Sequence, residues 1–84
     1  MSPADPSPLS AMVGALARGL VDNPDQVEVR EERDGDSRVI SLYVAETDLG
    51  QVIGRGGRVA RALRVILRAA SGARGERASL EIVD

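Results

Sequence analysis

The stretch I-G-R-G-G-R at residues 53–58 constrains the fold more than any other part of this chain. Three of its four central positions are glycine, which disfavours the interiors of both helices and strands. The flanking residues nevertheless suit helices. T-D-L-G-Q-V-I (47–53) fits one or two turns capped by Thr47 or Asp48, and a longer helix is expected from Arg58 to about Ala70. The glycines therefore predict a sharp connection between two helices.

The longer helix is expected to have two contrasting faces. Its packed face should contain apolar residues at helical spacing, namely Val59, Leu63, Ile66 and Ala70, with Ala62 beside them. At about 100° per residue, the opposite face gathers three arginines, Arg61, Arg64 and Arg68. A solvated stripe and a basic face for an anionic partner are both open interpretations of these arginines.

The remaining pattern predicts an opening helix and three strands. Ser7-Pro8 is a favourable start for a helix whose apolar stripe runs from Leu9 to Leu20, and Asp22-Asn23-Pro24 ends it. Strands are expected at 27–33, 38–45 and 77–83, and the first two should form a hairpin around the turn D-G-D (34–36). The order α-β-β-α-α-β predicts an α+β fold, a three-stranded sheet with helices packed on one face.

Size and composition exclude several classes of protein. With 84 residues, we expect a flexible lead at residues 1–6 and a single domain over 7–84. The absence of Cys and His removes disulfides, the usual zinc ligands and the usual general base, so we expect no enzyme activity, cofactor, metal or small-molecule substrate. No apolar stretch of membrane-spanning length and no signal peptide stand out, which predicts a cytoplasmic protein without a membrane partner. Tyr43 is the only aromatic residue.

Charge is distributed unevenly along the chain. The net charge is −2, but residues 50–77 hold seven arginines against Glu76 alone. Residues 1–49 hold four arginines against ten acids. A local basic face matters more for an anionic partner than the overall charge does.

Known glycine motifs for phosphate binding do not match the hinge. A P-loop requires lysine, which this chain lacks, and the dinucleotide fingerprint would require glycine where Val59 stands. The remaining pattern is G-x-x-G at residues 54–57 between two helices. Such a loop allows close approach of a sugar-phosphate backbone, and the helix that follows offers free N–H groups to phosphate oxygens. The alternative is a helix–helix turn without a ligand.

In this context V-I-G-R-G-G-R-V-A-R-A-L (52–63) resembles the signature of KH domains of the prokaryotic, type II topology. The resemblance extends to the small stand-alone bacterial KH proteins, the KhpA-like family, through the Asn-Pro turn after the opening helix and the ending Leu80-Glu81-Ile82-Val83-Asp84. It covers about residues 9–84. It implies an RNA-binding module that clamps about four single-stranded nucleotides, with an apolar groove under the bases.

The resemblance also implies the site and the partners. Gly54, Arg55, Gly56 and Gly57 would form the clamp, Arg55 and Arg58 would contact phosphate, and the apolar neighbours would be Val52, Ile53 and Val59. Gly56 departs from many relatives, which carry a polar residue there, so affinity could be lower. Two functions follow. The first is an RNA chaperone or post-transcriptional regulator that binds single-stranded RNA. The second is a dimerising interaction module with weak or no RNA binding, which pairs with itself or with a larger KH-containing protein of the Jag type.

Overall fold

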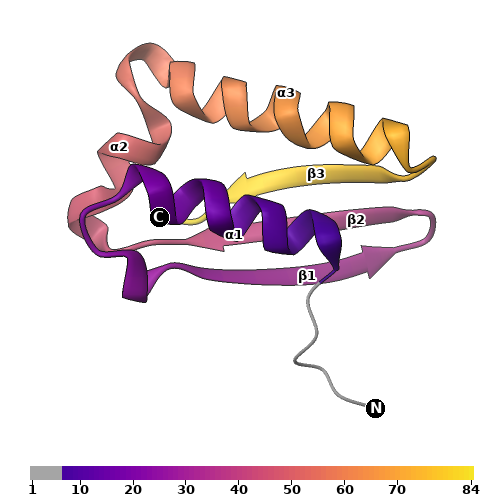
Figure 1. Ribbon diagram of the computed structural model, residues 1–84, viewed down its shortest axis with the longest axis horizontal. Helices are drawn as coiled ribbons and strands as arrows, with labels where there is room; N and C mark the ends of the chain where they lie inside the picture. The colour runs from indigo at the N-terminus through magenta and orange to yellow at the C-terminus, as the bar shows by residue number, and fades with distance from the viewer. Residues whose placement is uncertain (1–6) are drawn as a thin grey trace.

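The computed structural model describes residues 7–84, so the expected lead at 1–6 lies outside the described residues. Three α-helices and three strands follow in the predicted order: α1 (Pro8–Leu20), β1 (Glu28–Asp34), β2 (Ser37–Tyr43), α2 (Leu49–Ile53), α3 (Arg58–Ala73) and β3 (Arg77–Ile82). Short 3₁₀ turns lie at Pro24–Gln26, Glu46–Asp48 and Arg55–Gly57. Figure 1 shows α3 running beside β3, and α2 lies at the end of the sheet opposite the turn that joins β1 to β2.

The sheet is mixed and has the order β1-β2-β3. β1 and β2 are antiparallel, with Glu28 opposite Tyr43, which confirms the predicted hairpin. β2 and β3 are parallel, with Ile40 opposite Leu80. β2 is therefore the central strand, and β1 and β3 each have one free edge within the described part of the chain. This arrangement agrees with the type II KH fold.

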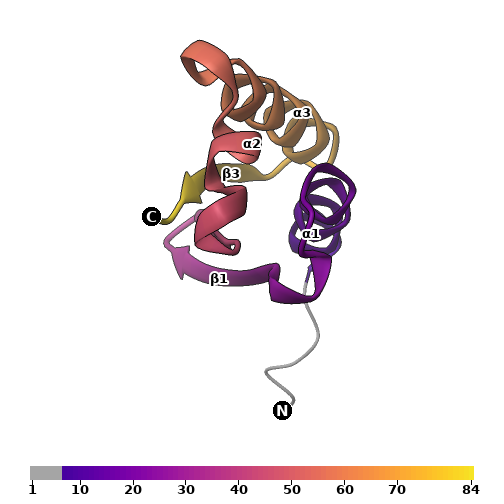
Figure 2. The ribbon, with the colours of Figure 1, turned by 90° about the vertical axis from the view of Figure 1, so that its left-hand side faces the viewer.

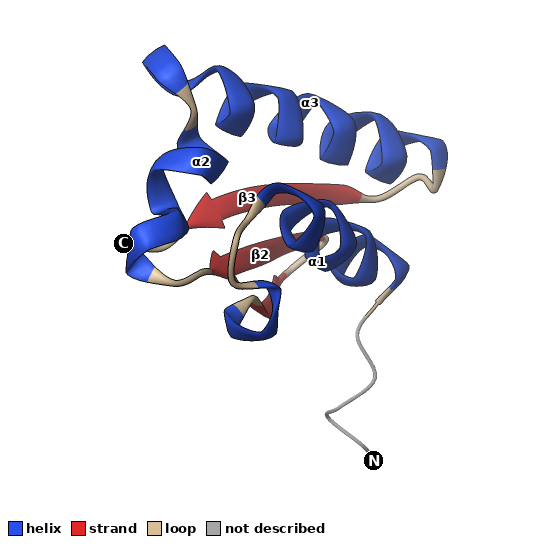
Figure 3. Ribbon diagram, turned by 60° about the vertical axis from the view of Figure 1, so that its left-hand side comes forward, coloured by secondary structure: helices blue, strands red, loops and turns tan. Residues whose placement is uncertain are grey.

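The helices lie on one side of the sheet, as predicted (Figures 2 and 3). The core between them is built from buried residues of α1, the strands and α3, and its members are Leu9, Val13, Ala17, Val27, Ile40, Leu42, Leu63, Leu67 and Leu80. Complete burial of a leucine or isoleucine contributes about 1.5–3 kcal/mol. The opening helix begins as expected, because the Ser7 side chain accepts a hydrogen bond from the Ser10 N–H at 3.2 Å and Pro8 follows.

The packed face of α3 agrees with the predicted one only in part, since Leu63 is buried and Val59 and Ala70 are partly buried against the core. Its buried residues are Ala60, Leu63, Leu67 and Ser71. Ile66, expected to be packed, is 42% exposed, and Val65 beside it is 60% exposed. α3 also continues three residues beyond the predicted end, to Ala73. The helix is therefore turned relative to the expectation, and this rotation changes which side chains flank its buried face.

Candidate functional site

The glycine hinge forms a compact loop between α2 and α3, at the upper left of Figure 1. α2 ends at Ile53, a 3₁₀ turn covers Arg55–Gly57, and α3 begins at Arg58. The Gly54 N–H donates to the Gly50 carbonyl at 2.8 Å, and the Gly57 N–H donates to the Gly54 carbonyl at 3.0 Å. The loop therefore has a defined backbone conformation.

Both the backbone conformation at residue 54 and its close contact with Val59 require glycine there. Its φ and ψ are 77° and 168°, a region occupied almost only by glycine. A Cβ at this position would lie 2.5 Å from Cγ2 of Val59 and 2.8 Å from its backbone nitrogen. The loop thus returns closely over the first turn of α3. Gly56 differs, because its φ is +63° but a Cβ there would meet nothing within 4 Å.

Two arginines and the start of α3 make this end of the molecule cationic. Arg55 and Arg58 are exposed, and neither forms an ion pair with an acid of residues 7–84. The N-cap of α3 is Gly57, and no side chain caps this helix end. The Arg58 N–H donates to the Arg55 carbonyl, so the positive end of the α3 dipole and the two exposed guanidinium groups are what make this end of the molecule suited to an anion.

The apolar residues expected beside the loop lie at different depths. Val52 is fully buried, so its side chain packs in the interior beneath α2. Ile53 is 36% exposed, and Val59 is half-buried against Gly54. Of the three, Ile53 and Val59 therefore offer apolar surface next to the loop.

Arg64 forms a contact that the helical spacing of Arg61, Arg64 and Arg68 did not predict. Its Nε donates to the backbone carbonyl of Leu80 in β3 at 3.4 Å. The helical spacing of the three arginines could be read from the sequence. The strand beside them could not, because that depends on how α3 packs.

A buried carboxylate holds the base of α2 in place. Asp48 is 1% exposed and accepts hydrogen bonds from the Asp22 N–H at 3.3 Å and from the Asn23 N–H and Nδ2, each at 3.0 Å. Of the two predicted caps, Thr47 and Asp48, Asp48 stands at the N-cap position of α2, but its side chain forms no capping bond to the helix. The carboxylate instead joins the α1–β1 connection to the helix that leads into the glycine loop.

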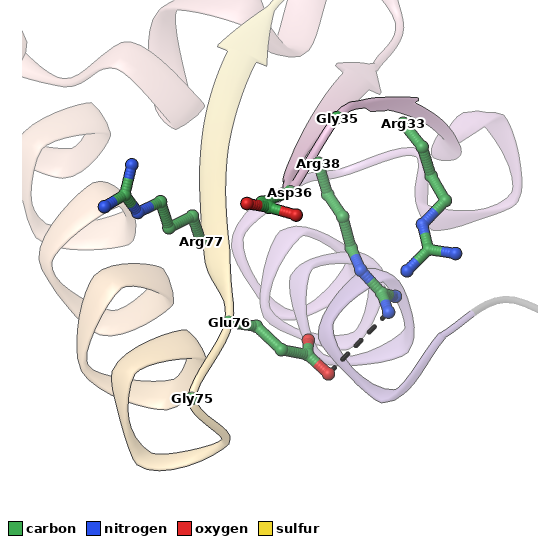
Figure 4. A pocket seen from close by; sticks show the side chains of 7 residues that line it. All are labelled: Arg33, Gly35, Asp36, Arg38, Gly75, Glu76 and Arg77. Atoms are coloured by element: carbon green, nitrogen blue, oxygen red, sulfur yellow. Dashed lines mark ion pairs between the residues drawn. The ribbon is translucent and has the colours of Figure 1, made fainter.

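A second polar feature lies at the far end of the sheet (Figure 4). It is a hollow of about 410 Å³ lined by Arg33, Gly35, Asp36, Arg38, Gly75, Glu76 and Arg77. Arg38 lies 3.1 Å from Glu31 and 3.7 Å from Glu76, so its charge is balanced from within the fold. Among residues 7–84, no group of His, Cys, Asp or Glu is arranged to hold a metal ion.

Glu31 belongs to the same network. Burial by itself raises the pKa of the Glu31 carboxyl, but hydrogen bonds donated by the Ser10 and Ser7 hydroxyls and the nearby Arg38 guanidinium outweigh it. The pKa of Glu31 consequently lies below its ordinary value. This carboxylate links the start of α1 to β1 and β2.

Comparison with known proteins identifies relatives over nearly the whole chain. The family model described as the KH domain of KhpA/KhpB matches residues 10–82. The RNA-binding protein KhpA of Caldanaerobacter subterraneus subsp. tengcongensis is 43% identical over 75 residues, covering 89% of this chain and all of the relative. The RNA-binding protein KhpA of Streptomyces coelicolor is 49% identical over 69 residues, covering 82% and 86% of the two chains. That of Aquifex aeolicus is 46% identical over 78 residues, covering 93% and 99%. In residues 7–84, no helix is long and apolar enough to cross a membrane.

Proposed function

This chain belongs to the KhpA/KhpB family of KH domains, and from that premise we propose that it binds single-stranded RNA through the loop Gly54–Gly57. The observation that carries the proposal is the glycine loop between α2 and α3, with exposed Arg55 and Arg58 beside a helix start that has no side-chain cap. One strand phosphate would lie near the start of α3, where the helix dipole and the Arg55 and Arg58 guanidinium groups would attract it. Ile53 and Val59 would support the adjacent bases.

Binding of this kind should be weak and tolerant of sequence. The site recognises the backbone, and the only aromatic residue, Tyr43, lies on β2 under the Arg30 guanidinium rather than at the loop. A protein that binds single strands weakly and broadly in the cytoplasm would serve as an RNA chaperone or post-transcriptional regulator.

The test is fluorescence anisotropy with a labelled octauridylate at low salt. The double variant Arg55→Asp with Gly56→Asp places two anions at the loop, and aspartate tolerates the positive φ of residue 56. Its affinity should fall by at least about tenfold, because repulsion replaces a phosphate contact. Arg33→Asp with Gly35→Asp is the matched control, since it makes the same charge change at another positive-φ glycine at the far end of the sheet. A folded loop variant that binds like the wild type would refute the clamp.

A second function, a dimerising interaction module, has its own support. Val65 and Ile66 are adjacent on α3 and are 60% and 42% exposed. We propose that a second copy of the chain or a larger KH-containing protein of the Jag type covers them, which would remove apolar surface from water. Sedimentation of the wild type and of Val65→Ser with Ile66→Ser should show a dimer lost in the variant. A wild type that remains monomeric up to high concentration would exclude self-association.

A further inference from the structure

The contact between Arg64 and Leu80 places one side of α3 against the free edge of the sheet. The Val83 N–H donates to the Leu42 carbonyl at 3.0 Å, so residue 83 directs its backbone groups toward β2. Backbone groups alternate in direction along a strand, so those of Leu80 point away from β2. Within residues 7–84, β3 pairs in the sheet with β2 alone, and the Leu80 carbonyl is therefore an edge group that Arg64 reaches from α3.

Arg61 and Arg68 extend this contact into a row. The positions 61, 64 and 68 are three and four residues apart and share one side of α3. Arg61 Nη1 lies 4.0 Å from the point where a Cβ on Gly57 would be, so this guanidinium reaches back to the glycine loop. We call Arg61, Arg64 and Arg68 the arginine row. It begins at the loop and continues along α3 on the side that meets the edge of β3.

The arginine row is not neutralised by the fold. All three residues are exposed, and the ion pairs among residues 7–84 involve other arginines. Like charges three and four residues apart on a helix repel one another. The row is thus a strip of positive charge on a chain whose net charge is −2. A polyanion that lies along the row would relieve this repulsion.

We propose that the bound strand continues past the glycine loop along the arginine row, so that the RNA footprint is longer than the four nucleotides of the clamp. This inference rests on the proposed function. From residue 61 to residue 68 the helix rises about 10 Å, at 1.5 Å per residue. A stacked strand carries one phosphate per about 3.4 Å, so the row matches about three further phosphates.

The experiment compares tetrauridylate with octauridylate on the wild type and on a row variant, Arg61→Gln with Arg64→Gln and Arg68→Gln. Glutamine keeps helix propensity and removes the charge. For each protein we take the ratio of the affinity for octauridylate to the affinity for tetrauridylate. The longer strand can bind a short site in several positions, and this advantage is the same for both proteins, so it drops out when their ratios are compared. Arg18→Gln with Arg30→Gln and Arg33→Gln is the control that removes the same charge elsewhere. Circular dichroism and sedimentation establish that all three proteins share one fold and one oligomeric state.

The row variant should bind tetrauridylate nearly as the wild type does and should lose the additional affinity for octauridylate. Its salt dependence for octauridylate should be shallower by about two in the logarithmic slope, at about 0.7 per phosphate on a single strand. When salt rises from 50 to 200 mM, the factor by which the affinity for octauridylate falls would be roughly 20 times smaller for the row variant than for the wild type.

Three results would overturn the extended footprint. The first is that the wild type and the row variant have the same ratio of octauridylate to tetrauridylate affinity and the same salt dependence of octauridylate binding. The second is an equal loss of both oligonucleotides in the row variant, which would make the row part of the four-nucleotide clamp. The third is a wild type that binds neither oligonucleotide, and only this result would also refute the proposed function.

Discussion

Replacing Gly54 by alanine should destabilise the domain more than any other glycine-to-alanine change in the loop. The backbone at Gly54 has φ 77° and ψ 168°, and a side chain in this region costs about 1–3 kcal/mol. The new methyl group would also lie 2.5 Å from Val59 Cγ2 and 2.8 Å from the Val59 nitrogen. Relief of such overpacking costs about 1–3 kcal/mol more. The expected loss is therefore about 2–6 kcal/mol, a large part of the stability of a small domain.

Two other glycines provide matched controls in the same helix–loop–helix segment. Gly56 also has positive φ, but its Cβ would meet nothing within 4 Å, so Gly56→Ala should cost only about 1–2 kcal/mol. Gly50 lies in α2, exposed and without a nearby atom, so Gly50→Ala should stabilise by about 0.5–1 kcal/mol.

Urea unfolding followed by circular dichroism measures all three free energies without reference to RNA. If Gly54→Ala does not fold alone, it can be measured in the Gly50→Ala background. A Gly54→Ala loss equal to that of Gly56→Ala would show that the contact with Val59 adds nothing, and the reasoning would fail.

Two further changes test the polar anchors of the fold. Asp48→Ala would remove the buried carboxylate that accepts three hydrogen bonds from Asp22 and Asn23, and it should lower the free energy of unfolding by about 1.5–3 kcal/mol. Exposed Asp25→Ala should have little effect, and similar urea midpoints for the two variants would contradict this account. Since the pKa of Glu31 lies below its ordinary value in the folded state, its carboxylate should stabilise the fold at neutral pH, and this contribution should be lost as the pH falls through the folded pKa. Urea unfolding between pH 7 and 3 should therefore show a smaller acid loss for Glu31→Gln than for the wild type, and parallel curves would refute the assignment.

The sequence allowed prediction of features that depend on neighbours along the chain. The cap at Ser7-Pro8, the hairpin around Gly35 and the glycine connection before Arg58 each follow from local backbone chemistry, and the structure confirms them. Asp48 was one of two candidates for a local cap, with Thr47, because both residue types suit that position. Its actual partners lie 25 and 26 residues away, beyond what local patterns report.

In the candidate site, too, local features could be predicted from the sequence, whereas features that depend on tertiary packing could not. The glycines and the arginines around them were recognised from spacing, but the depth of Val52 and the reach of Arg64 depend on tertiary packing. Sequence could not distinguish a buried valine from one beside the loop, because α2 is only five residues long and has little periodicity.

The rotation of α3 relative to the expected packed face has a physical cause. It affects both proposed binding surfaces, the apolar pair Val65 and Ile66 and the arginine row. Apolar residues occupy more than half of this helix, so helical periodicity alone supports several packed faces. The buried face carries the small residues Ala60 and Ser71 at its ends, which allow close approach to neighbouring elements. This choice leaves Val65 and Ile66 exposed and brings Arg64 to the edge of β3. The apolar pair and the arginine row are therefore neighbours on one helix, and binding of a protein partner should alter the affinity for RNA, with the reciprocal effect of RNA on the partner.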